Sequence, residues 1–333
     1  METLLPRLSL VIAALAFLLI VAACGGGDDA KPTPFPTSSD PSRNIPKDQL
    51  RGINVVMAGS DWYKGDNNFV FGITNAKDEP EGGAQATATF YDLRDAKNPK
   101  PVFTAQAIAS APGVGPKVEV THANGDKHVH GGENDNRVGY YVKVNFDHAG
   151  FWGIAVEAKL KDGKTGTSNI GFQVQEKASV IAVGQNAPKS DNLTKADVKD
   201  LSEIDSGSPP NDMHTVKIKD AIAKGRPVVV VFSTPAFCTS RFCGPVNEEV
   251  EALQALYKEK VDFVHIEIWR DFDKKIMNPA VKEWILRADG GLTEPWVYIV
   301  DSKGVVFERW EGPVAKNVME PAVRAVSEGK TLK

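Results

Sequence analysis

Apolar and polar residues alternate in short runs from about residue 50 to residue 175. Runs of period two predict strands that are buried on one face, and turn signals such as Glu81-Gly82-Gly83 separate them. Few segments in this half show helical periodicity, so we expect an all-β sandwich over residues 50–175. The predicted strands are Ile53–Met57, Phe69–Thr74, Ala86–Asp92, Val102–Ile108, Tyr140–Phe146, Trp152–Leu160 and Asn169–Val174.

One stretch of this half, VNFDHAGFWGIAVEAKLKDG, consists of a strand, an Ala-Gly turn and a second strand that carries Trp152. It resembles an immunoglobulin-like module, and the resemblance implies an immunoglobulin-like sandwich. The insert Ala109–Arg137 is rich in Gly, Asn and His, so we expect a surface loop there. Within it, His128 and His130 would lie on one side of an extended chain, with His122 nearby. This pair is a weak candidate for zinc or copper, and no metal is predicted because the spacing supplies no third ligand.

The pattern changes beyond about residue 214, where apolar runs and helical periods alternate. Val228–Ser233 is a run of β-branched and aromatic residues typical of a buried strand, and the next apolar residues recur at helical spacing. The order of elements is βαβαββα. The residues on the helical face are Val246, Val250, Leu253 and Tyr257. The other elements are a strand end with a short helix (His214–Lys224), a strand (Val261–Trp269), a helix with Val281 and Trp284 inward (Ala280–Arg287), a hairpin (Trp296–Val300 and Val305–Trp310) and a closing helix (Asn317–Ser327).

Two segments rich in Pro, Gly and Ser connect these parts. Residues 24–49 include GGGDD and KPTPFPTSSDPS, a composition that cannot offset the entropy of ordering, so we expect a flexible tether. Residues 176–213 form a linker that leads into the second folded part from about residue 184. The predicted domain order is therefore a leader at 1–23, the tether, the sandwich at 50–175, the linker, and an α/β domain at 214–333.

The leader carries Arg7 before an apolar run, Leu8–Ala23, which is short for a bilayer span. Its end, VAACG, resembles the bacterial lipobox. That resemblance implies cleavage before Cys24, lipidation of Cys24, and a membrane-anchored protein on the extracytoplasmic side. The alternative is an uncleaved membrane anchor, and either reading places the remainder where disulfides persist.

Composition limits the partners. The chain of 333 residues has a formal net charge of −4, and its Lys and Arg residues are scattered rather than clustered. Because a surface that follows phosphates needs clustered positive charge, we expect no nucleic acid partner. The chain holds three cysteines, and Cys238 and Cys243 remain for chemistry once Cys24 is assigned to the lipid.

Three stretches resemble the thioredoxin-like superfamily, in its TlpA-like and peroxiredoxin-like branch. They are VGQNAP at 183–188, VVFSTPAFCTSRFCGPV at 230–246, and LTEPWVYIVDSKGVV at 292–306. The resemblance implies a thioredoxin-like fold, thiol–disulfide exchange through Cys238 and Cys243, and a cis-proline at Pro295. It also implies that Glu294, Pro295 and Trp296 bind substrate and that Phe237 stands where many relatives carry Trp.

The spacing departs from the family's Cys-x-x-Cys. Residues five apart in a helix lie roughly 8 Å apart along the axis, whereas a disulfide wants Cα atoms within about 7 Å. Closing the ring therefore requires non-helical backbone between Cys238 and Cys243. We expect the helix to begin near Cys238, with Pro245 marking a kink; the alternative places Pro245 in the first turn, after a loop. A helix start at Cys238 would stabilise its thiolate, with Arg241 adding positive charge.

The predicted function is a membrane-anchored extracytoplasmic thiol–disulfide oxidoreductase that acts on protein thiols and disulfides and needs no cofactor. Cys238 would attack and Cys243 would resolve the mixed disulfide. Three alternatives stay open. One is a non-catalytic binding lipoprotein with a thioredoxin-like scaffold and a structural disulfide. The second is a peroxiredoxin-like peroxidase, although Pro235 stands where that family wants Ser or Thr and Thr234 is one step further away. The third is a copper handler of the SCO type, for which His265 is a candidate ligand although it is more simply read as a hydrogen-bonded core residue.

Overall fold

The computed structural model describes residues 52–95, 98–112, 118–121, 127–130, 138–238, 240 and 242–332, which all belong to one compact unit. The predictions for the leader, the tether, Cys24, His122 and Arg241 lie outside these residues. None of the helices among the described residues is long and apolar enough to cross a bilayer.

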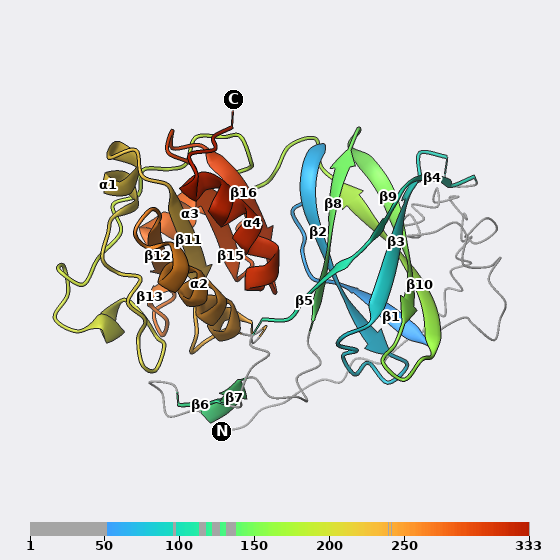
Figure 1. Ribbon diagram of the computed structural model, residues 1–333, viewed down its shortest axis with the longest axis horizontal. Coiled ribbons are helices and arrows are strands. Elements are labelled where there is room, and N and C mark those ends of the chain that lie inside the picture. The colour runs from blue at the N-terminus through green and yellow to red at the C-terminus, as the bar shows by residue number, and fades with distance from the viewer. Residues whose placement is uncertain are drawn as a thin grey trace, which may run out of the picture. The chain divides into compact units, whose positions relative to one another are not determined.

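The first half of the described chain contains two four-stranded antiparallel sheets (Figure 1). One has the order β1-β2-β8-β5 and the other the order β10-β9-β3-β4. The predicted β-rich half is confirmed. The strands are β1 (Ile53–Met57), β2 (Gly65–Asn75), β3 (Gln85–Asp92), β4 (Lys100–Gln106), β5 (Ile108–Ser110), β8 (Gly139–Phe146), β9 (Gly150–Lys159) and β10 (Thr165–Val174).

Two details of this half differ from expectation. The single strand predicted over 102–108 is divided, because β4 pairs with β3 in one sheet while β5 pairs with β8 in the other. Alternation did not reveal the break, since a strand that changes sheets keeps its period of two. The insert expected to be a loop contains a hairpin, β6 (Val118–Thr121) and β7 (Lys127–His130).

Aromatic side chains fill the core between the two sheets. Phe69 and Phe90 meet edge to face with ring centroids 5.0 Å apart, and Phe146 meets Trp152 at the same distance. Phe172 contacts Phe69 at 4.8 Å from the opposite sheet. These rings explain the strong strand signal, because large aromatic residues pack well on a pleated, half-buried surface.

The second half is built on a four-stranded sheet of order β12-β11-β15-β16, in which β11 is parallel to β12 and antiparallel to β15. Helices α1 and α3 bury apolar residues in one core cluster, and α2 and α4 bury theirs in another. This is a thioredoxin-like arrangement, and the predicted βαβαββα order is confirmed. The elements are η2 (Leu201–Glu203), α1 (Ile218–Ala223), β11 (Val228–Ser233), α2 (Cys243–Tyr257), β12 (Asp262–Glu267), α3 (Pro279–Trp284), β15 (Trp296–Val300), β16 (Val306–Glu311) and α4 (Lys316–Ser327).

A small hairpin, β13 (Trp269–Asp271) with β14 (Ile276–Met277), follows β12 and was not expected. The strand predicted over 261–269 therefore ends at Glu267. The turn predicted at 301–304 does join β15 to β16, and Asp301 stabilises it by accepting hydrogen bonds from the N–H groups of Lys303 and Val305.

The two halves share an apolar cluster. Val70 and Tyr141 of the sandwich lie in the same buried cluster as residues of β11, α2 and α4. Gly312 follows β16 with φ of +80°, and a Cβ atom there would lie 2.6 Å from the carbonyl oxygen of Ala58. Glycine is therefore required at this point, both for the backbone conformation and for the close approach of the two chain segments.

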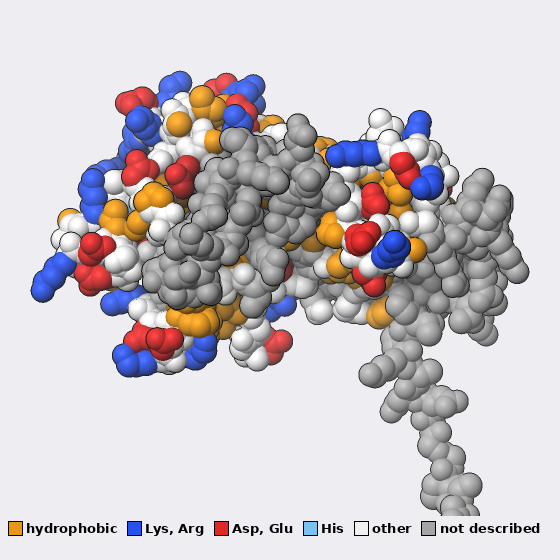
Figure 2. Space-filling view, turned by 90° about the horizontal axis from the view of Figure 1, so that it is seen from below, with side chains coloured by type: hydrophobic (Ala, Val, Ile, Leu, Met, Phe, Trp, Pro, Cys, Tyr) orange, Lys and Arg blue, Asp and Glu red, His pale blue; other side chains and the backbone are white. Residues whose placement is uncertain are grey.

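The described surface carries charges of both signs. On the face drawn in Figure 2, Lys and Arg side chains are interspersed with Asp and Glu side chains. This distribution agrees with the small net charge of the chain, −4.

Candidate functional site

A disulfide joins Cys238 to Cys243 where β11 ends, with Cα atoms 6.0 Å apart. The strand leads into a turn in which Phe237 donates its N–H to the carbonyl oxygen of Thr234. Cys238 is half-buried, whereas Cys243 is fully buried. The two sulfurs therefore differ in access, and Cys238 is the one that a visiting group can reach.

The helix that follows begins at Cys243 rather than near Cys238. The expected kink at Pro245 is wrong, because Pro245 lies in the first helical turn, where its missing N–H has no intrahelical acceptor to lose. The alternative that the spacing left open, a loop between the cysteines, is what the structure shows. One consequence follows for the thiolates. The residue at the N-terminus of α2 is Cys243, so the stabilisation expected for Cys238 from the helix falls on its partner.

The loop before β15 lies beside the disulfide. The Glu294–Pro295 peptide bond is cis, as predicted. The hydroxyl of Ser240, between the cysteines, lies 3.2 Å from the Cys238 sulfur and donates to the Glu294 carbonyl oxygen at 3.4 Å. Trp296 is only 2% exposed and donates its indole N–H to Thr293, so its side chain supports the loop from behind.

The side chain of Glu294 is the acidic group of the site. Its carboxylate lies within 4.8 Å of both sulfurs. Burial raises the pKa of Glu294 to about 7; Thr234 offsets part of this rise, and the charge of Glu267 adds to it. A carboxyl group with this pKa takes up and releases protons near neutral pH. Sequence reasoning assigned Glu294 only a substrate-binding role, because its pKa depends on neighbours distant in the chain.

Three side-chain oxygen atoms at this site are buried. They are Thr234 Oγ1, Glu267 Oε1 and Glu294 Oε2. Burial also raises the pKa of Glu267, whose other oxygen accepts from the N–H of Ser206 at 2.9 Å. The two carboxyl groups with raised pKa values, Glu267 and Glu294, thus lie close enough together for the charge of Glu267 to raise the pKa of Glu294.

His265 belongs to a separate buried network. Its ring nitrogens contact Ser233 Oγ at 3.0 Å and the Asn211 side chain at 2.9 Å. Asp205 lies 3.4 Å from His265 and 3.0 Å from His214. The reading of His265 as a hydrogen-bonded core residue is confirmed. The His265 ring lies within 4.8 Å of the Asp205 and His214 side chains. Among the described residues, the two cysteine sulfurs have the Glu294 carboxylate, not His265, within the same distance.

The charges of Asp205 and His265 shift the pKa values of both residues. Burial alone would raise the pKa of Asp205, but the positive charge of His265 and hydrogen bonds from both histidines outweigh burial and hold that pKa well below its usual range. Conversely, burial would lower the pKa of His265, and the Asp205 charge raises it above its ordinary value.

An aromatic cluster includes Phe237, the residue before Cys238. Phe237 stacks on Phe272 with ring centroids 4.1 Å apart, and Lys275 places its ammonium 3.5 Å above the Phe272 ring. Trp269 meets Phe272 edge to face. Phe237 was expected next to the site, but Phe272 was not, since no local pattern links the two rings.

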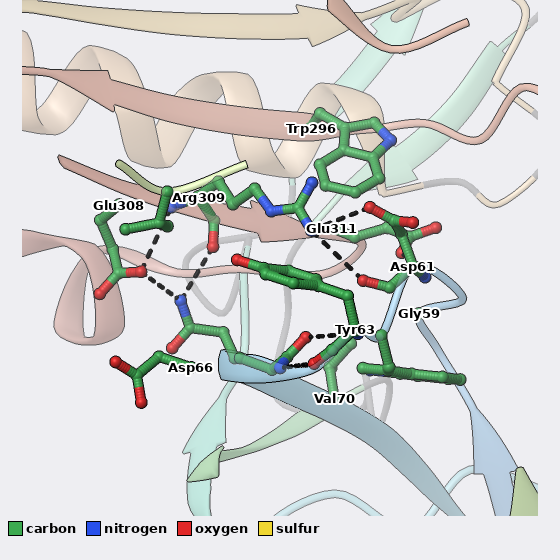
Figure 3. Close-up of a pocket in the computed structure, with 13 residues that line it drawn as sticks. Gly59, Asp61, Tyr63, Asp66, Val70, Trp296, Glu308, Arg309 and Glu311 are labelled. Atoms are coloured by element: carbon green, nitrogen blue, oxygen red, sulfur yellow. Dashed lines mark hydrogen bonds and ion pairs between the residues drawn. The ribbon is translucent and has the colours of Figure 1, made fainter. Parts of the chain in front are cut away.

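Hydrogen bonds tie the sandwich to the loop before β15. Glu311 accepts from the N–H of Ser60 at 2.7 Å and from the Thr293 hydroxyl at 2.7 Å. Arg309 pairs with Asp61 at 2.8 Å, and its guanidinium lies 4.9 Å from the centroid of the Tyr63 ring (Figure 3). The segment after β1 is thereby held against the loop that carries Glu294.

A cavity of about 410 Å³ lies between the segment after β1 and the loop that carries Glu294. Its lining comes from the sandwich, from the loop between the cysteines, and from the segments around Glu294 and Gly312. A cavity of this size matches the lower range of ligand sites.

The histidine pair of the insert lies on β7. Residues 128 and 130 are two apart in this strand, which puts them on one face as expected, but their side chains are outside the described part of the chain. The metal prediction for this pair stays untested.

No protein-family model and no curated protein matches the chain. One solved structure that resembles it is described as a "putative Thiol:disulfide interchange protein DsbE from Chlorobium tepidum". The two share 17% identity with a TM-score of 0.32, over 44% of this chain and 99% of that one. The thioredoxin-like assignment therefore depends on the strand order and helix arrangement described above, not on this match.

Proposed function

We propose that this protein is a thiol–disulfide oxidoreductase that acts on protein disulfides through Cys238 and Cys243. The observation that carries the proposal is a disulfide with one partly exposed sulfur, Cys238, and the half-buried carboxyl group of Glu294 within 4.8 Å of both sulfurs. A disulfide with a purely structural role does not require a carboxyl group with a pKa of about 7 beside its sulfurs.

The exchange proceeds in two steps. The thiolate of reduced Cys238 attacks a substrate disulfide, which forms a mixed disulfide and releases the first substrate sulfur as a thiolate. Glu294 then accepts the proton of the Cys243 thiol, and the Cys243 sulfur attacks Cys238. The second substrate sulfur leaves, the substrate is reduced by two electrons, and the protein is oxidised to the disulfide seen in the structure. The reverse sequence oxidises a dithiol.

The proposal includes location and architecture. The lipobox-like VAACG supports lipidation at Cys24, anchoring on the extracytoplasmic side of the membrane, and partners among the protein thiols and disulfides found there. Two antiparallel sheets packed around an aromatic core support an immunoglobulin-like identity for the sandwich.

The test uses the full chain in detergent with insulin as a disulfide substrate and dithiothreitol as the electron source. We expect Cys238→Ser to abolish catalysed reduction, Cys243→Ser to accumulate a mixed disulfide, and Cys24→Ser to retain activity as the matched cysteine control. Equal activity of Cys238→Ser and the unaltered protein would refute the proposal.

Equilibration in graded thiol buffers followed by alkylation measures the reduction potential of the Cys238–Cys243 pair. This potential distinguishes a redox-active disulfide from a structural one. A potential between about −120 and −270 mV supports exchange, and a value below about −300 mV supports the non-catalytic scaffold. Peroxide consumption by the same preparation would instead favour the peroxidase, and stoichiometric Cu(I) binding would favour the copper handler.

A further inference from the structure

The cavity of about 410 Å³ beside the disulfide has walls from both halves of the chain. One wall is the sandwich segment 56–60. The opposite wall includes Ser240, Phe242 and Glu294, and Glu294 lies within 4.8 Å of both sulfurs. A group held in this cavity is therefore next to the reacting sulfurs.

The sandwich wall is an edge strand with an exposed apolar side chain. Strand β1 stands at the end of its sheet, and Val56 on it is 48% exposed. The free edge of β1 is engaged at Val55, whose N–H donates to Ser168 Oγ of β10 at 3.3 Å, and the residues from Val56 to Ser60 line the cavity. An extended peptide segment that carries a disulfide can place a side chain against this wall while its sulfur lies at the cysteines.

The wall is fixed in place. Glu311 accepts hydrogen bonds from the N–H groups of Ser60 and Asp61, at 2.7 and 3.2 Å, and from Thr293 on the opposite side. Gly312 approaches the Ala58 carbonyl too closely for any side chain. These contacts lie within the chain and fix the wall, so binding does not have to order it first.

We infer that this cavity is a substrate subsite for a bulky apolar side chain, one or two residues from the cysteine of an extended peptide segment. The inference deepens the proposed function and rests on it. Most of the lining is apolar or backbone, with Val56, Met57, Ala58, Phe242 and Pro313 among its members. An apolar side chain of the substrate is removed from water there, whereas an acidic one would lose its hydration beside the carboxylates of Glu294 and Glu311.

The test compares two ten-residue peptides that differ only in Leu or Ser next to a single cysteine, each joined by a disulfide to glutathione. Reduction by the dithiothreitol-reduced full chain releases glutathione. We expect kcat/KM to be about 10- to 100-fold higher for the Leu peptide, the range that a hydrophobic pocket discriminates. Glutathione disulfide, which brings no apolar side chain, serves as the reference substrate.

Two matched variants locate the effect. Val56→Trp fills the cavity, and Val102→Trp alters a valine of similar exposure, 53%, on the edge strand β4 away from it. We expect Val56→Trp to remove the preference for Leu, and Val102→Trp to leave that preference unchanged. Unfolding midpoints of both variants check that they fold.

Equal kcat/KM for the two peptides, or equal effects of the two variants, would overturn the inference. Equal turnover is also the result expected if the N-terminal segment of the chain itself occupies the cavity. Calorimetry with versions of the peptides in which the cysteine is replaced by serine keeps the two proposals apart. Tighter binding of the Leu version, lost in Val56→Trp, sustains the subsite even if Cys238→Ser shows that exchange is not the activity.

Discussion

The carboxylate of Glu294 lies within 4.8 Å of the Cys243 sulfur, although the two residues are 51 positions apart in the chain. Cys243 is fully buried in the disulfide form. In the exchange proposed above, the nearby carboxyl group would be the acceptor, and its pKa of about 7 suits that role at neutral pH.

Glu294→Gln should slow exchange and stabilise the fold. Loss of the proton acceptor should lower the rate by about 100-fold and remove the titration near pH 7, leaving that of the thiols at higher pH. Because burial raises the pKa of Glu294 above the unfolded value of about 4.3, the fold loses stability as pH rises towards about 7. The variant should therefore be more stable than the unaltered protein at pH 8 and equal to it at pH 4.

Stopped-flow rates and urea unfolding measure the two effects of Glu294→Gln, with the exposed Glu259→Gln as the control. A variant that is slower and also less stable at pH 8 would contradict the role assigned to Glu294.

Asp205→Asn should destabilise the protein in a pH-dependent way. The lowered pKa of Asp205 contributes stability above about pH 4 that is lost as pH falls, and the raised pKa of His265 contributes stability below about pH 6.5 that is lost as pH rises. The cost should be greatest between these values, at about 3–5 kcal/mol, because the buried histidine loses its counter-charge. Urea unfolding at pH 5.5 and pH 9 measures the difference. Asp191→Asn, which removes an exposed partner of Lys217 and Lys219, should change stability at neither pH.

Asp61→Asn should destabilise the contact between the sandwich and the α/β half. Asp61 and Arg309 are 5% and 7% exposed, and removing one partner of a buried ion pair costs about 3–5 kcal/mol. The double variant Asp61→Asn with Arg309→Met should recover part of this loss, since no buried charge remains unpaired. Denaturant unfolding of the single and double variants measures the coupling. Lys143→Met, which removes the exposed partner of Glu308, should cost at most about 1 kcal/mol.

Gly312→Ala should cost more than Gly163→Ala, although both glycines have positive φ. A Cβ atom at Gly163 meets nothing within 4 Å, so the cost there is the backbone penalty of about 1 kcal/mol. At Gly312 the new atom collides with the Ala58 carbonyl oxygen, which adds overpacking of about 1–3 kcal/mol. Thermal and urea unfolding compare the two; equal losses would show that the close approach at Gly312 is unimportant.

Much of the fold was predictable because its signals are local. Strand β11 was predicted with its observed bounds, since six consecutive buried positions leave a run that only a central strand explains. The helical spacing of Val246, Val250 and Leu253 gave α2, and all three are fully buried. The start of α2 was mispredicted, because a proline fits both the first turn and a kink, and family spacing favoured the wrong choice.

The candidate site was predictable only in part. Sequence named Cys238, Cys243, Glu294 and Pro295, which lie in two stretches. It missed Phe272, which stacks on Phe237, and it gave no reason to place Glu267 near Glu294. These pairings arise from the packing of β12 and the loops against the end of β11, and periodicity in one segment carries no information about its neighbours in another.

The sequence by itself determined the order of strands and helices, the presence of a cysteine pair after a buried strand, and the position of the proline beside it. Tertiary structure alone decided which sulfur is accessible, how far burial raises the pKa of Glu294, and that the sandwich forms a wall of the cavity. The physical reason is range: secondary structure follows from neighbours within a few residues. Burial, charge and close approach depend on groups such as Asp61 and Arg309, which are 248 positions apart and meet only when the chain is packed.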